Sequence, residues 1–99
     1  MEKKYRILLA EDEAKLAKAI QAELTRVGYE VDVADNGLQA DKMFMENDYS
    51  MALLDINLPG KNGMALCSDF RKRSANMPIV MLTAVGEIHD KVAAFNIGA

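Results

Sequence analysis

The order of hydrophobic and polar residues divides the chain into alternating extended and helical segments. Three segments are apolar almost without interruption, at residues 5–10, 51–54 and 79–82. Runs of this kind are typical of strands buried on both faces of a parallel sheet. Residues 29–34 alternate apolar and polar side chains instead, which predicts a half-exposed strand at the edge of the sheet.

Between these strands, apolar residues recur at the spacing of one helix face. Gly28 is placed to stop the first helix, and Asp35 or Asn36 to cap the start of the second. The predicted helices cover about residues 13–27, 38–46, 63–74 and 87–98.

Four strand–helix units in succession predict an α/β fold, a doubly wound parallel sheet with helices on both faces. Because only residues 29–34 carry an edge pattern, we expect the strand order 2-1-3-4 in chain numbering. Right-handed connections then place the first helix on one face and the later helices on the other. Ninety-nine residues without a linker or repeat predict one domain, residues 1–99.

Composition and charge narrow the classes of function. A net charge of -3 and a pI near 5.1 argue against a general attraction to nucleic acid or to anionic membranes. No apolar stretch has the length of a signal peptide or a membrane span, so we expect a cytoplasmic location. The single Cys67 forms no internal disulfide and most simply serves as a small core residue.

Polar residues follow three of the predicted strands. Glu11 and Asp12 come after the first strand, Asp55 after the third and Thr83 after the fourth. In open α/β sheets, ligands bind outside the carboxyl ends of the strands, where the strand order reverses. Carboxylates so close together repel unless a cation joins them, and Mg²⁺ prefers oxygen ligands shared with phosphate. This pattern predicts a magnesium site and phosphate chemistry.

Each of these residues also has a structural alternative. Asp12 is suited to opening the first helix, Thr83 to a helix cap or a turn, and Asp55 by itself to a turn. However, residues 11–13 are all acidic, although a helix cap needs only one such residue. A capping box that starts at Asp12 would also need an acid at position 15, where Lys15 stands. Convergence at one edge of the sheet favours the site.

Together, these motifs resemble the receiver domain of two-component response regulators along the whole chain. Residues 7–13 resemble the family's first strand and acidic pair, residues 55–63 its phosphoacceptor loop, and residues 82–84 its hydroxyl position. The resemblance implies a flavodoxin-like fold in which Asp55 takes a phosphoryl group from a sensor histidine kinase. Thr83 would then bind a phosphoryl oxygen.

The resemblance also implies a Mg²⁺ ion held by Glu11 or Asp12, by Asp55 and by the backbone carbonyl of Asn57. Phosphorylation would be relayed as a conformational change to the surface of the fourth helix. The expected partners are a histidine kinase and an output domain outside this chain, such as one that binds DNA. A domain of this kind phosphorylates itself and is not a turnover enzyme.

The chain departs from the family pattern at its end. The family's fifth strand, phosphoryl-pairing lysine and fifth helix have no counterpart before Ala99, so we expect a truncated fragment. Lys61 lies on the phosphoacceptor loop, but its turn-like neighbours argue against its replacing that lysine. An open apolar edge at residues 79–82 would favour an oligomer or an exchanged element.

Two rival functions stay open. The missing lysine favours a receiver-like interaction module that is never phosphorylated. A haloacid-dehalogenase-like phosphatase also uses an aspartyl phosphate, but it needs an acid where Asn57 stands. A Mg²⁺-dependent response to acetyl phosphate or beryllofluoride that Asp55→Asn abolishes separates the receiver from the module. Turnover of a phosphate ester would indicate the phosphatase.

Overall fold

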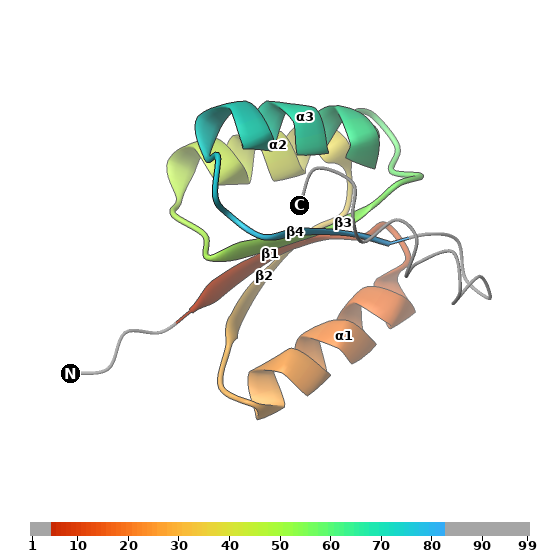
Figure 1. Cartoon of the computed structure of the whole chain (residues 1–99). Coiled ribbons are helices and arrows are strands. Elements are labelled where there is room, and N and C mark those ends of the chain that lie inside the picture. Colours follow the sequence, from red (N-terminus) through yellow and green to blue (C-terminus); the bar gives the residue numbers. More distant parts are fainter. Residues whose placement is uncertain (1–4, 83–99) are drawn as a thin grey trace.

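The computed structural model describes residues 5–82, which form a four-stranded parallel sheet between two layers of helices (Figure 1). The strand order β2-β1-β3-β4 confirms the predicted order. Thr83 and the predicted helix at 87–98 lie outside the described residues. The elements are β1 (Arg6–Ala10), α1 (Ala14–Arg26), β2 (Glu30–Ala34), α2 (Gly37–Glu46), β3 (Met51–Asp55), α3 (Gly63–Arg73) and β4 (Ile79–Leu82).

The register of the sheet brings the ends of the strands to one edge. Ala10, the last residue of β1, lies opposite Ala34 in β2 and Leu54 in β3. Asp55 pairs with Leu82 at the end of β4. Because all three pairs are parallel, the residues that follow the strands emerge side by side at the carboxyl edge of the sheet.

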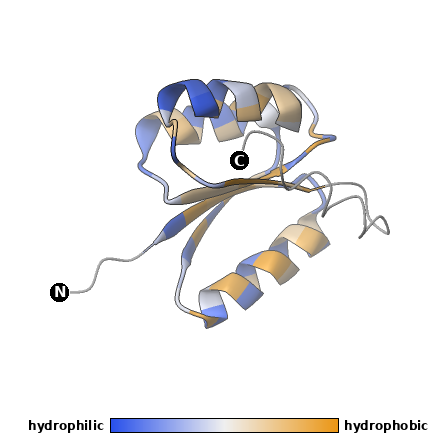
Figure 2. Cartoon of the chain, viewed as in Figure 1, coloured by the Kyte–Doolittle hydropathy of each residue, from blue (hydrophilic) through white to orange (hydrophobic). Residues whose placement is uncertain are grey.

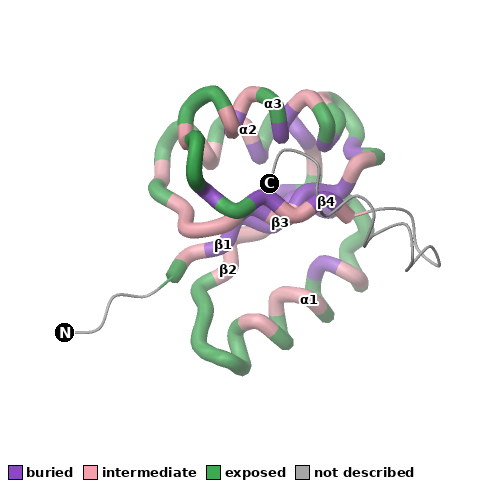
Figure 3. Tube along the Cα trace, viewed as in Figure 1, coloured by how far each residue is buried: buried purple, intermediate pink, exposed green. Residues whose placement is uncertain are grey.

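The main core lies between the sheet and the layer formed by α2 and α3 (Figure 3). Leu54 and Phe70 are fully buried there, and the ring of Phe70 stacks on that of Phe44 with centroids 3.9 Å apart. These contacts join α2 to α3 above the sheet. Burying such side chains contributes about 1.5 to 3 kcal/mol each, which makes this layer the firm support for the loops at its end.

The opposite face of the sheet is covered by α1 and is less closed (Figures 1 and 3). Figure 2 shows apolar and polar residues alternating along α1, as in an amphipathic helix. Ala17 is nevertheless its one buried residue, and Val27, the last residue of the predicted helix, is 56% exposed. Leu53 and Val80 on this side are only half-buried. Burial on both faces, predicted for three strands, therefore holds for β1 alone.

Helix ends position the loops at the carboxyl edge. The Asn36 side chain accepts a hydrogen bond from the Gln39 amide (2.8 Å), and that of Asn62 accepts one from the Ala65 amide (2.9 Å). These caps begin α2 and α3. Gly28 has φ +106°, a left-handed conformation that ends α1 as predicted.

Cysteine and methionine, two residue types common in protein cores, differ in their burial here. Cys67 is buried, as expected of a small core residue. Met77 and Met81 are buried in the core, whereas Met45 and Met64 are exposed. Within residues 5–82, no helix combines the length and the apolar character needed to cross a membrane.

Candidate metal centre

Three carboxylates meet at the carboxyl edge of the sheet, and we call Glu11, Asp12 and Asp55 the acidic cluster. One oxygen from each carboxylate lies within 4.8 Å of the others. Glu11 and Asp55 are only 4% and 7% exposed, whereas Asp12 faces solvent. In the described part of the chain, this is the one group of three potential ligands with such spacing. The sequence prediction that these three residues lie together is confirmed.

Backbone amides hold the two buried carboxylates in place. The side chain of Glu11 accepts a hydrogen bond from the amide of Glu13 (3.1 Å), and Asp55 Oδ1 accepts one from the amide of Asn57 (3.1 Å). Glu13 occupies the N-cap of α1 without a side-chain bond to the helix. Asp12 is therefore not the cap of this helix, which removes the structural alternative considered for it.

The electrostatics of the acidic cluster favour a bound cation. Burial raises the pKa of the Glu11 and Asp55 carboxyl groups. The amides of Glu13 and Asn57 oppose this rise, and the nearby Asp12 carboxylate adds to it. Among residues 5–82, every lysine or arginine ion pair involves other carboxylates. Two like charges 4 Å apart repel by about 4 kcal/mol at an effective dielectric of 20. A divalent ion with oxygen ligands relieves that repulsion, so the donor set suits Mg²⁺.

The loop after β3 runs from residue 56 to residue 62 and closes on itself. The Gly63 amide donates to the Ile56 carbonyl (3.1 Å), and a Cβ added to Gly63 would lie 2.2 Å from the Asp55 carbonyl oxygen. Glycine is therefore required at position 63. Asn57, whose carbonyl is a predicted ligand of the ion, stands near the start of this closed loop.

Lys61 does not join the acidic cluster. The Lys61 ammonium contacts the carboxylate of Asp69 and lies 3.7 Å from that of Asp41, so it is engaged by α3 and α2. This agrees with the expectation that Lys61 does not replace the phosphoryl-pairing lysine. Thr83 lies outside the described residues, and its role stays a prediction.

Asp35 is a neighbour of the site that was not among the predicted residues. It lines a pocket of about 410 Å³ together with Glu11 and Asp12. Asp35 directly follows β2, so the rule that collected the other acids at strand ends applies to it equally. Its position after a strand could have identified Asp35 from the sequence. The turn that follows favoured its interpretation as a helix cap instead.

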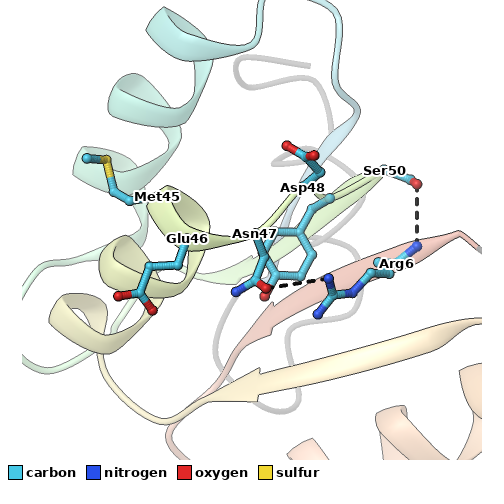
Figure 4. Close-up of a pocket in the computed structure, with 7 residues that line it drawn as sticks. Arg6, Met45, Glu46, Asn47, Asp48 and Ser50 are labelled. Carbon is cyan, nitrogen blue, oxygen red and sulfur yellow. Dashed lines mark hydrogen bonds between the residues drawn. The ribbon is translucent and has the colours of Figure 1, made fainter.

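A second polar cluster lies at the opposite, amino end of the sheet, and we call Arg6, Asp32 and Tyr49 the amino-end network. Asp32 Oδ2 accepts hydrogen bonds from Arg6 Nη2 (2.7 Å) and from the Tyr49 hydroxyl (2.8 Å). The guanidinium of Arg6 lies 5.3 Å from the Tyr49 ring centroid and points towards Asn47 (Figure 4). Burial and the bond to Asp32 raise the pKa of Tyr49. Here each charge has a partner.

Comparisons with known proteins agree with this geometry. Residues 7–99 match the response regulator receiver domain family. The chain is 39% identical to the transcriptional regulatory protein TctD of Salmonella typhimurium over 94 residues, covering 95% of this chain and 42% of TctD. It is 41% identical over 99 residues to the transcriptional regulatory protein YkoG of Bacillus subtilis, covering the whole chain and 43% of YkoG. It thus spans about two fifths of the length of these relatives.

Solved structures show the same fold. The response regulator TrrA of Thermotoga maritima, solved in complex with Mg²⁺ and BeF, matches with a TM-score of 0.79 and 33% identity, over 93% of this chain and 82% of TrrA. A CheY-like receiver domain from Methanospirillum hungatei matches with a TM-score of 0.83 and 27% identity, over 98% of this chain and 78% of that one. The chain belongs to the response regulator receiver domain family.

Proposed function

We propose that this chain is a phosphoacceptor, in which Asp55 receives a phosphoryl group from the phosphohistidine of a sensor histidine kinase. The observation that carries the proposal is the acidic cluster, with two buried carboxylates and one exposed carboxylate at the switch point of a receiver fold. Mg²⁺ would be held by Glu11 or Asp12, by Asp55 and by the backbone carbonyl of Asn57. The TrrA complex with Mg²⁺ and BeF supports this choice by similarity.

Phosphoryl transfer to Asp55 requires its carboxyl group to be ionised. A carboxylate oxygen of Asp55 attacks phosphorus, the phosphorus–nitrogen bond breaks, and the electron pair returns to the histidine of the kinase. The amide of Asn57 holds Asp55 Oδ1 and favours the ionised form. When bound, Mg²⁺ supplies positive charge against the equatorial phosphoryl oxygens. Burial of Glu11 and Asp55 limits competing contacts with water around the reacting carboxylate.

The transcriptional regulators that this chain resembles support an output domain as the second partner. We propose that the phosphorylated chain changes the surface it presents to such a domain, and that it does so in the cytoplasm without acting as a turnover enzyme. Thr83 keeps its predicted part, a hydroxyl that binds a phosphoryl oxygen. Association through the outer edge of β4, the end strand of the described sheet, also stays a prediction.

Phosphorylation by acetyl phosphate and by a phosphorylated histidine kinase tests this function. Intact-mass analysis should show one added phosphoryl group on the wild-type chain with Mg²⁺ and none after chelation. Asp55→Asn should abolish the addition, because the amide is a poor nucleophile. Asp48→Asn is the matched control, since Asp48 is exposed on the loop before β3 and outside the acidic cluster.

Either of two results would contradict the proposal. One is a phosphoryl group on the Asp55→Asn variant at the wild-type rate. The other is an unmodified wild-type chain under all phosphodonors, which would favour the interaction module that works without phosphorylation.

A further inference from the structure

The side chain of Lys61 bridges two helices across the loop that follows Asp55. Its ammonium contacts the Asp69 carboxylate on α3 and lies 3.7 Å from the Asp41 carboxylate on α2. Lys61, Asp41 and Asp69 are all half-buried, with side chains 27%, 30% and 32% exposed. One oxygen of Asp41 is fully buried without a hydrogen-bond partner, so this carboxylate depends on the ammonium for compensation.

The backbone of the same loop lies directly against the start of α2. The Gly37 amide donates to the Pro59 carbonyl (2.9 Å), and a Cβ added to Gly37 would lie 1.7 Å from the Lys61 carbonyl oxygen. Gly60 takes φ +83° and packs on Leu38. Helix α2 and the loop are thus in contact at three successive loop positions.

The start of the loop is bonded to the acidic cluster and to β4, and its far end is bonded back to its start. The Ile56 amide donates to the Leu82 carbonyl (2.9 Å), and the Asn57 amide donates to Asp55 Oδ1. The far end closes through the bond from the Gly63 amide to the Ile56 carbonyl. A loop of seven residues fixed at its start, middle and end has little freedom, so releasing it at Lys61 should also loosen the position of Asn57.

We infer that Lys61 is a positioning residue for the acidic cluster: its ammonium, held between Asp41 and Asp69, fixes the 56–62 loop in the conformation that offers Asn57 to the metal. This inference rests on the proposed function, because it concerns the same Mg²⁺ ion. Residues that orient metal ligands affect affinity without touching the metal. Lys61 touches no member of the acidic cluster and acts through the loop.

The first measurement needs no metal. Amide hydrogen exchange at Gly37 and Gly63 reports the bond from α2 to the loop and the closure of the loop. Lys61→Met keeps the length of the side chain and removes the charge, so exchange at both glycines should rise by about tenfold in the metal-free chain. Lys61→Arg should restore most of the protection. Lys42→Met is the matched control, since Lys42 is an exposed lysine next to Asp41.

The second measurement is the Mg²⁺ dissociation constant, followed by the chemical shifts of Asn57 and Asp55. Lys61→Met should weaken binding by about tenfold, the lower end of the range for residues that orient metal ligands. Asp69→Asn should weaken it too, and the double variant should be no worse than Lys61→Met alone. At saturating Mg²⁺, phosphorylation by acetyl phosphate should return to the wild-type rate.

The outcomes separate this inference from the proposed function. Unchanged exchange at Gly37, or faster exchange with an unchanged Mg²⁺ constant, would overturn the role of Lys61 and leave phosphorylation at Asp55 intact. A wild-type chain that binds no Mg²⁺ would instead overturn the proposed function. Faster exchange together with weaker Mg²⁺ binding, both absent in Lys42→Met, supports the inference.

Discussion

The two ends of the sheet handle buried charge in opposite ways. At the amino end, the carboxylate of Asp32 is bonded to the Arg6 guanidinium and to the Tyr49 hydroxyl. At the carboxyl end, Glu11 and Asp55 are more deeply buried, and their nearest ionic neighbours within the described residues are other carboxylates. The charges at the amino end are compensated within the folded chain, whereas the carboxyl end carries unbalanced negative charge.

This difference distinguishes a polar cluster that supports the fold from one that binds a ligand. A compensated network stabilises the chain under all conditions in which its groups keep their charges. An uncompensated cluster weakens the free chain and is retained where a cation or another charged ligand completes it. The same sheet, with the same strands, holds both.

The largest effect should come from completing the acidic cluster. Mg²⁺ at about one hundred times its dissociation constant should raise the free energy of unfolding by about 2.7 kcal/mol, because the ion binds only the folded chain. Denaturant melts with and without Mg²⁺ measure this gain. Asp55→Asn should lose most of it, and Asp32→Asn at the amino end should keep all of it. An equal gain in both variants would mean that the ion binds elsewhere.

Removing one carboxylate charge at each end of the sheet by an Asp→Asn substitution should change the free energy of unfolding of the metal-free chain in opposite directions. Asp55→Asn removes like-charge repulsion and should stabilise the fold by about 1 to 2 kcal/mol. Asp32→Asn removes the nearer of the two ionic partners of Arg6 and should destabilise the fold by about 1 kcal/mol. Urea melts under chelating conditions test the pair. The contrast between the two ends fails if both variants shift stability in the same direction.

Removing one hydroxyl from the amino-end network should have a smaller effect. Tyr49→Phe leaves the ring against the Arg6 guanidinium and deletes one of the hydrogen bonds to Asp32, so it should cost about 1 kcal/mol. Thermal melts at several Mg²⁺ concentrations measure the cost, and the Mg²⁺-dependent gain should match that of the wild type. A reduced Mg²⁺ gain would show that the two ends are coupled.

A still smaller effect is expected from pH. Burial holds the pKa of Glu11 and Asp55 above the ordinary values of 4.5 and 3.8, so the folded chain keeps protons that the unfolded chain has released. The contribution of these two groups to stability is therefore lost as pH rises from the ordinary values through the folded ones. Chelated samples should show this fall, which Asp55→Asn should flatten. Mg²⁺ should bind more weakly in acid, because it competes with those protons.

Much of the architecture followed from pattern alone. Apolar runs and one alternating strand sufficed for the order β2-β1-β3-β4, and helix ends were found within a few residues through Asn36 and Gly28. Periodicity works here because a parallel sheet demands burial that few residue types satisfy. It overstated the burial of α1, since spacing along a helix does not reveal how much covers its face.

The sequence also predicts which residues form the site, but not how the charged residues around it pair. Acids that follow adjacent parallel strands must share one edge of the sheet, so the sequence correctly predicts that Glu11, Asp12 and Asp55 lie together. The pairing of Lys61 with Asp41 and Asp69 was not foreseen, because it joins residues from the loop and two helices whose approach depends on packing.

The sequence by itself determined which residues stand at the carboxyl edge of the sheet, because strand direction and order follow from hydrophobic periodicity and chain connectivity. Only the tertiary structure decided that Glu11 and Asp55 are buried while Asp12 is exposed, and that Lys61 is bonded to α2 and α3. Burial and ion pairing depend on distances between segments far apart in the chain. Those distances are set by how the helices pack on the sheet, which no local pattern encodes.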